Sequence, residues 1–139
     1  MLIVPNREGF IYYSGRYFTA EWYYTEDGKL PGLEYYKELS TQSRVRFLQI
    51  VKLFCDSAYG TLFPLTLYRI ENKENKIYAF KPRDERFFNF TIAGAKVIIT
   101  NAYRKHSQQM TKLDLECLKI AIRYKQDYLK RVKEGTYYD

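Results

Sequence analysis

The spacing of apolar residues changes along this 139-residue chain, and the change limits the folds that the chain can adopt. Within residues 44–59, apolar side chains recur at three- and four-residue steps. They are Phe47, Ile50, Val51, Phe54 and Ala58. This spacing predicts a helix with one buried stripe. Ser40 or Thr41 can cap its start, and Gly60 can end it.

Beyond this helix the apolar period shortens to two, which is typical of β-strands. The strand-like runs are LTLYRI, IYAF, RFFNFTI and KVIITNAY, and polar turns separate them. In RFFNFTI, Phe88 and Phe90 fall on one face of the strand, while Phe87 and Asn89 fall on the other. Consecutive runs of this kind predict an antiparallel meander. Upstream, residues 10–25 are rich in aromatic types and predict one or two more strands.

Two further helices complete the pattern. The run LEYYKEL after Pro31 predicts a short helix, and Thr111 with Asp114 has the signature of a capping box. That box opens a last helix, which Gly135 can end. Its expected inner residues are Leu118, Ile122, Leu129 and Val132. The order of elements predicts an α+β fold with an antiparallel sheet of about four to five strands, two N-terminal helices and one C-terminal helix.

The length fits a single domain spanning residues 1–139. Residues 1–15 can form an N-terminal extension, either an added strand or a partner-binding arm. Pro5 interrupts the short apolar start, so a signal peptide is not expected. No apolar run approaches the roughly 20 residues of a membrane helix, and we therefore expect a cytoplasmic protein without membrane contacts. The tail 137–139 receives no role from the sequence.

Composition points to a polyanionic partner. The chain has 23 Lys and Arg against 16 Asp and Glu, a net charge of +7 that favours RNA or an acidic protein. Its 15 tyrosines can stack on bases, but packing is the commoner role on strands. Cys55 and Cys117 lack metal-ligand spacing and are expected to be reduced thiols. No Gly-rich phosphate loop or G-x-S-x-G motif occurs, so no cofactor or metal is expected.

Three separated blocks of the sequence carry a family resemblance. They are YYTEDGKLPGLEYYKEL, IYAFKPRDERFFNF and ITNAYRKHSQQMTKLDLECLKIAIRYKQDYL. A D-G-K-x-P turn at residues 27–31, a strand ending at Lys81, and Arg86 opening the next strand stand in the family's order. Together the blocks resemble the phage-derived branch of the RelE/HigB toxins of type II toxin-antitoxin systems, within the RelE/ParE superfamily.

The resemblance implies a RelE/ParE-like fold and, where the toxin is active, cleavage of mRNA in the ribosomal A site. The implied partners are the ribosome with its mRNA and a small helix-turn-helix antitoxin that neutralises the toxin. Two departures stand out. In the Lys105–Thr111 run, His106 and Gln109 replace lysines of the family pattern. Ala79 stands where family members usually carry Glu, so the chain is impaired if that carboxylate is required.

Metal-free RNA cleavage can use the 2′-hydroxyl as the nucleophile, and the protein must then supply a base, an acid and cations. Our candidate catalytic residues are Arg86, Lys105, His106 and Lys81, and our candidate RNA-binding residues are Arg83, Arg104 and Tyr103. Arg86 can grip two phosphate oxygens. His106 is the only histidine, and an ordinary histidine exchanges protons near neutral pH. Tyr128 is expected to pack on the sheet.

Two other functions fit the same sequence. One is an inactive or gyrase-directed, ParE-like member of the superfamily, which Ala79 and the altered lysine run favour. The other is a non-enzymatic module in which aromatic strands and a basic helix bind RNA or a protein. Toxicity on expression distinguishes the last from an active toxin.

Overall fold

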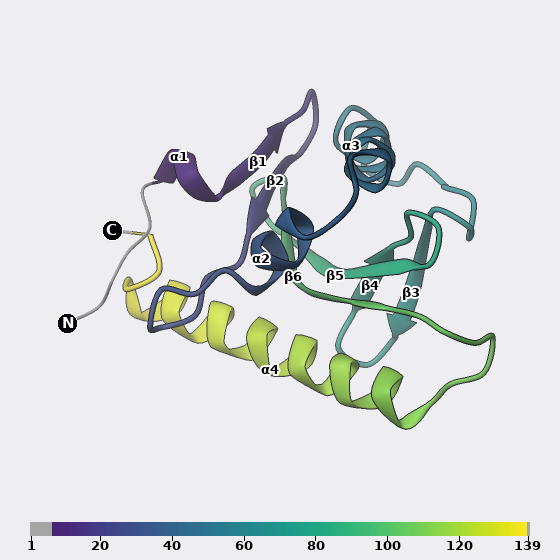
Figure 1. The fold of residues 1–139 in the computed structure, drawn as a ribbon. Helices are drawn as coiled ribbons and strands as arrows, with labels where there is room; N and C mark the ends of the chain where they lie inside the picture. Colours follow the sequence, from purple (N-terminus) through teal and green to yellow (C-terminus); the bar gives the residue numbers. More distant parts are fainter. Residues whose placement is uncertain (1–6, 139) are drawn as a thin grey trace.

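A computed structural model of the protein describes residues 7–138 (Figure 1). Its elements in chain order are α1 (Arg7–Phe10), β1 (Ile11–Ser14), β2 (Thr19–Trp22), α2 (Pro31–Lys37), α3 (Thr41–Cys55), β3 (Tyr68–Asn72), β4 (Ile77–Phe80), β5 (Glu85–Ile92), β6 (Lys96–Arg104) and α4 (Lys112–Glu134). No helix in this part of the chain is long and apolar enough to span a membrane.

The strands form one six-stranded sheet in the order β1-β2-β6-β5-β4-β3. The meander from β3 to β6 is antiparallel, as the alternating runs predict. However, β2 pairs with β6 in parallel, with Thr19 opposite Lys96 and Trp22 opposite Ile99. The α+β class is therefore confirmed, but the expected antiparallel sheet of four to five strands is wrong. The chain leaves the sheet after β2 and returns through the meander, whose last strand runs beside β2 in the same direction.

Helices cover both faces of this sheet. Figure 1 shows α4 across one face, and α2 and α3 on the other. Trp22, Phe47 and Phe87 belong to the core under α2 and α3, whereas Phe90 and Tyr128 belong to the core under α4. The structure also adds the one-turn α1 to the three expected helices. The central strands carry apolar residues on both faces because each face is covered.

The long middle helix begins where the sequence predicts and ends earlier. The Ser40 side chain accepts a hydrogen bond from the Ser43 backbone amide at 3.2 Å and caps α3. The helix stops at Cys55, before Gly60, and Ala58 is exposed beyond it. The cause is tertiary: the carboxylate of Asp56, the C-cap, accepts hydrogen bonds from Tyr13 and from the Arg16 backbone.

Helix α4 has the predicted ends but a different inner face. Both hydrogen bonds of the Thr111–Asp114 capping box are present, and Gly135 ends the helix in the left-handed conformation. Leu118 is buried as expected, Ile122 is partly buried, and Leu129 and Val132 are exposed. Their places are taken by other α4 residues, namely Ala121, Tyr128 and Arg131.

Arg131 explains how a charge can occupy this core. Its guanidinium donates to the Asp127 carboxylate at 2.7 Å and to the Tyr24 carbonyl. It also lies 4.8 Å from the ring centroids of both Tyr24 and Tyr137, which suits a buried cation–π contact. The C-terminal tail thus belongs to the core: Tyr137 is fully buried, and Tyr138 donates to Glu21 at 2.6 Å.

The N-terminal extension contributes a strand. β1 pairs antiparallel with β2, with Ile11 opposite Glu21, and forms one edge of the sheet. The added-strand interpretation is therefore confirmed for residues 11–14. Residues 1–6, and Asp139 of the tail, lie outside the described part of the chain.

Candidate functional site

Four of the seven candidate residues gather on the α4-covered face, where β4, β5 and β6 meet the start of α4. They are Lys81, Arg86, Tyr103 and Lys105, here called the cation cluster. Arg86 lies opposite Tyr103 in the β5–β6 register. The Lys105 backbone amide donates to the Asp84 carbonyl at 2.8 Å, which keeps the chain beside β5 just past Arg86. The meander brings these residues together because each strand begins or ends there.

A tight turn positions Arg86. The turn runs through Pro82 and Arg83, and Arg83 has a φ of +58°. One guanidinium nitrogen of Arg86 donates to the carbonyls of Arg83 at 2.8 Å and Glu85 at 2.9 Å. Among the described residues, no carboxylate forms an ion pair with Arg86. Its charge is therefore available to an anionic ligand.

Lys81 sits in a positively charged surrounding. Its ammonium donates to the Leu65 carbonyl at 2.8 Å. Burial lowers the pKa of Lys81, and the like charges of Arg86 and Arg69 lower it further. The negative charge of Glu71 raises the pKa of Lys81. A lysine whose pKa is lowered gives up its proton more readily, as a general acid must.

Lys105 is held by Asp114 of the α4 capping box. The two side chains form an ion pair at 2.9 Å and are 14% and 4% exposed. Burial raises the pKa of Asp114, but hydrogen bonds from the Thr111 backbone, from Lys105 and from the Tyr103 hydroxyl outweigh it and hold the pKa well below its usual range. Burial and the Asp114 carboxylate raise the pKa of Tyr103. Tyr103 and Lys105 are thus fixed by one carboxylate.

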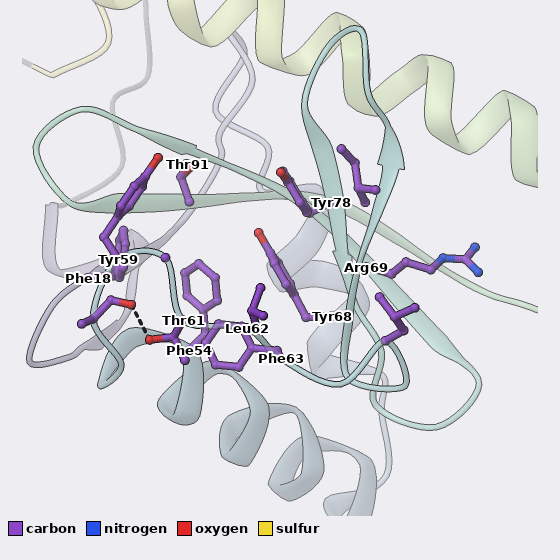
Figure 2. A pocket seen from close by; sticks show the side chains of 14 residues that line it. Phe18, Phe54, Tyr59, Thr61, Leu62, Phe63, Tyr68, Arg69, Tyr78 and Thr91 are labelled. Atoms are coloured by element: carbon purple, nitrogen blue, oxygen red, sulfur yellow. Dashed lines mark hydrogen bonds between the residues drawn. The ribbon is translucent and has the colours of Figure 1, made fainter.

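Two residues of β3 that we did not predict belong to this face. Arg69 lies opposite Ala79 in the β3–β4 register and forms an ion pair with Glu71 at 3.2 Å. In Figure 2 the Arg69 guanidinium points away from the cavity on the opposite, α3-covered face. Both side chains act on the pKa of Lys81. The alternation in YRIEN could have placed them on one face, but their nearness to Lys81 depends on the strand register.

The side chains of the three other predicted residues form no hydrogen bond or ion pair with the described side chains of the cluster. Arg104 follows Tyr103 and faces the other side, where it pairs with Glu85 at 3.2 Å and Asp84 at 3.4 Å. Arg83 and His106 are exposed. Within residues 7–138, the His106 side chain has no hydrogen bond or ion pair. No described contact links His106 to Arg86 or Lys81, and the roles assigned to these residues stay predictions.

Packing accounts for the remaining candidates. Tyr128 is fully buried, as expected, and contacts the Phe90 ring edge-on at 5.4 Å between centroids. Cys55 and Cys117 are free thiols, the first buried and the second partly buried. Among the described residues, no group of three His, Cys, Asp or Glu side chains could hold a metal ion.

Comparison with known proteins adds no family assignment: no protein-family model matches the chain, and no curated protein matches it significantly.

Proposed function

We propose that this protein is the toxin of a toxin-antitoxin system, a ribosome-dependent and metal-independent endoribonuclease that cleaves mRNA. The observation that carries the proposal is the gathering of Lys81, Arg86, Tyr103 and Lys105 on one face. The three sequence blocks that resemble RelE/HigB toxins support it. The net charge of +7 suits a protein that binds RNA on the ribosome.

The cluster offers a group for each step of the cleavage. The 2′-oxygen attacks phosphorus while its proton passes to a base, and the 5′-oxygen leaves with a proton from an acid. Arg86 would bind the non-bridging phosphate oxygens. Lys81, with its lowered pKa, is our choice of acid. Glu71 is our choice of base, because it brings a carboxylate from β3 to the surroundings of Ala79, where the family's usual Glu is missing.

The family resemblance also suggests a substrate, a partner and a location for the protein. The substrate would be mRNA on the ribosome in the cytoplasm, and a helix-turn-helix antitoxin would neutralise the toxin by covering the cationic face. Tyr103 would stack on a base, since it lies beside Arg86 and its ring already stacks on Phe88 at 5.7 Å. Lys105 would bind the RNA backbone.

A non-catalytic RNA-binding member of the same superfamily is the second candidate. It is favoured by the ion pair that commits Lys105 to Asp114, and by the exposed His106 side chain, which has no described contact with the cluster. In this case the cations would hold RNA without cutting it.

Induced expression in bacteria distinguishes the two. We expect wild-type protein to stop growth and to cut mRNA at ribosome-bound positions, and Arg86→Ala to relieve both effects. Lys130→Ala, which removes an exposed cation of α4 outside the cluster, is the matched control and should stay toxic. Normal growth with intact mRNA from folded wild-type protein would contradict the proposal and favour the binding module.

A further inference from the structure

A groove lies beside β3 at the edge of the sheet. It begins on the α3-covered face (Figure 2) and reaches Lys125 of α4. Two cavities of 420 Å³ and 690 Å³ make it up. Tyr59, Ile70 and Tyr78 line both, so the two cavities adjoin each other, and we call them together the edge groove. No residue of the cation cluster lines either cavity.

One end of the edge groove is apolar. Phe54 and Phe63 line it, with ring centroids 5.4 Å apart. The loop between α3 and β3 adds Tyr59, Leu62 and Leu65, which are 88%, 95% and 67% exposed. Single exposed apolar residues are ordinary, but contiguous exposed apolar patches are typical of interaction sites, and here three large side chains adjoin one cavity. Aromatic rings line much of this end, but those of Phe54, Phe63 and Tyr68 pack against one another. Leu62, its most exposed side chain, is aliphatic, and such side chains favour apolar protein groups over RNA bases, which stack on free aromatic planes.

The other end of the edge groove is cationic. Lys73, Lys76 and Lys125 line it, and no carboxylate among the described residues lines either cavity. The Lys125 ammonium donates to the Asn75 carbonyl at 2.6 Å. Lys73 and Lys76 form no ion pair within residues 7–138. These two charges are therefore free to meet carboxylates of a ligand.

We propose that the edge groove binds a segment of a partner protein in which bulky apolar side chains adjoin acidic residues. The apolar side chains would enter between Tyr59 and Leu62, and the carboxylates would meet Lys73 and Lys76. The combination of an apolar cavity with a cationic end selects such a segment over a wholly apolar or wholly acidic one. The edge groove is separate from the proposed ribonuclease site. The Lys73–Lys76 turn joins β3 to β4 at one end of these strands, whereas Lys81 follows β4 at the other end.

The test uses the full chain and a labelled synthetic peptide that carries two leucines and a phenylalanine next to three glutamates. One control peptide has lysines in place of the glutamates, and another has serines in place of the apolar residues. Binding is followed by fluorescence anisotropy at about 0.15 M salt, where the Debye length is about 8 Å and general attraction to a basic protein is reduced. Leu62→Ser and Lys76→Glu test the two ends of the edge groove. Leu129→Ser and Lys130→Glu alter exposed positions of α4 that line neither cavity, and they serve as controls with the same changes of residue type.

We expect the first peptide to bind, both groove variants to weaken binding about tenfold or more, and both α4 variants to leave it unchanged. Neither control peptide should bind comparably. The proposal is overturned if no peptide binds, or if the α4 variants weaken binding as much as the groove variants. It is also overturned if a single-stranded RNA competes for the groove, or if wild-type chain dimerises through it and Leu62→Ser restores the monomer. We expect Lys76→Glu still to arrest growth and to cut mRNA. A failure of the peptide-binding proposal can therefore be distinguished from a failure of the proposed ribonuclease function.

Discussion

Replacing Asp114 by Asn tests the electrostatic link between the capping box of α4 and the cation cluster. The wild-type carboxylate accepts hydrogen bonds from the Thr111 amide at 2.7 Å, from the Lys105 ammonium at 2.9 Å and from the Tyr103 hydroxyl. An Asn side chain has nearly the size of Asp and keeps one acceptor oxygen. It removes the negative charge beside Lys105, whose side chain is only 14% exposed. Hydrogen bonds to charged groups contribute about 1.5–3 kcal/mol each.

We therefore expect Asp114→Asn to lower the free energy of unfolding by about 2–3 kcal/mol at pH 7. Unfolding entropy is about 2.1 cal/mol/K per residue, so a chain of this length should lose roughly 7–10 °C in Tm. The matched control is Asp84→Asn, which breaks an ion pair whose two side chains are 58% and 67% exposed. It should cost less than about 1 kcal/mol.

The pH dependence gives a second check. The pKa of Asp114 is lower in the folded chain than its usual value, so its stabilising contribution is present above about pH 4 and is lost as the pH falls further. The stability difference between wild type and Asp114→Asn should consequently shrink on acidification below about pH 4. Urea unfolding at a series of pH values measures it. Equal stabilities at pH 7, or a difference that stays constant into the acid range, would refute the reasoning.

Three further predictions follow from packing. Gly15→Ala should destabilise by about 1–3 kcal/mol, because the new Cβ would lie 2.4 Å from the Cβ of Cys55, whereas Gly9→Ala meets nothing within 4 Å and should be neutral by thermal unfolding. Tyr137→Ala should cost about 3–5 kcal/mol in urea unfolding, because the side chain is fully buried; a near-neutral result would mean that the tail is not part of the core. Thiol titration of native protein should modify Cys117 slowly and Cys55 only on unfolding, since burial raises the pKa of Cys55 to about 12; rapid modification of both would contradict this.

Local patterns in the sequence predict the helices and strands. Long-range contacts determine the strand pairing, helix ends and core residues that these patterns do not predict. The meander and the capped ends of α4 depend on neighbouring residues, and both were predicted. The parallel pairing of β2 with β6 joins segments far apart in the sequence, which periodicity does not encode. Likewise, α3 ends at Cys55 because Asp56 forms a hydrogen bond with Tyr13 of β1. Arg131 can occupy the core under α4 because it forms cation–π contacts with aromatic rings and an ion pair with Asp127.

The candidate site follows the same division. Lys81, Arg86 and Tyr103 could be predicted as neighbours because adjacent strands of a meander bring their ends together. The side-chain alternation next to Tyr103 could also have excluded Arg104, which faces away. Glu71 could not be predicted there, because its place depends on the β3–β4 register.

The most direct measurement of the central claim is the chemistry of the RNA ends made by purified protein on ribosomes programmed with a defined mRNA. The account predicts cuts that leave a 2′,3′-cyclic phosphate and a 5′-hydroxyl, and that disappear when the nucleotide before the cut is 2′-deoxy. It also predicts that Arg86→Ala slows single-turnover cleavage by about 100-fold or more, while Lys130→Ala does not change the rate. Intact mRNA, or cuts that leave a 5′-phosphate and persist at the deoxy position, would contradict the claim.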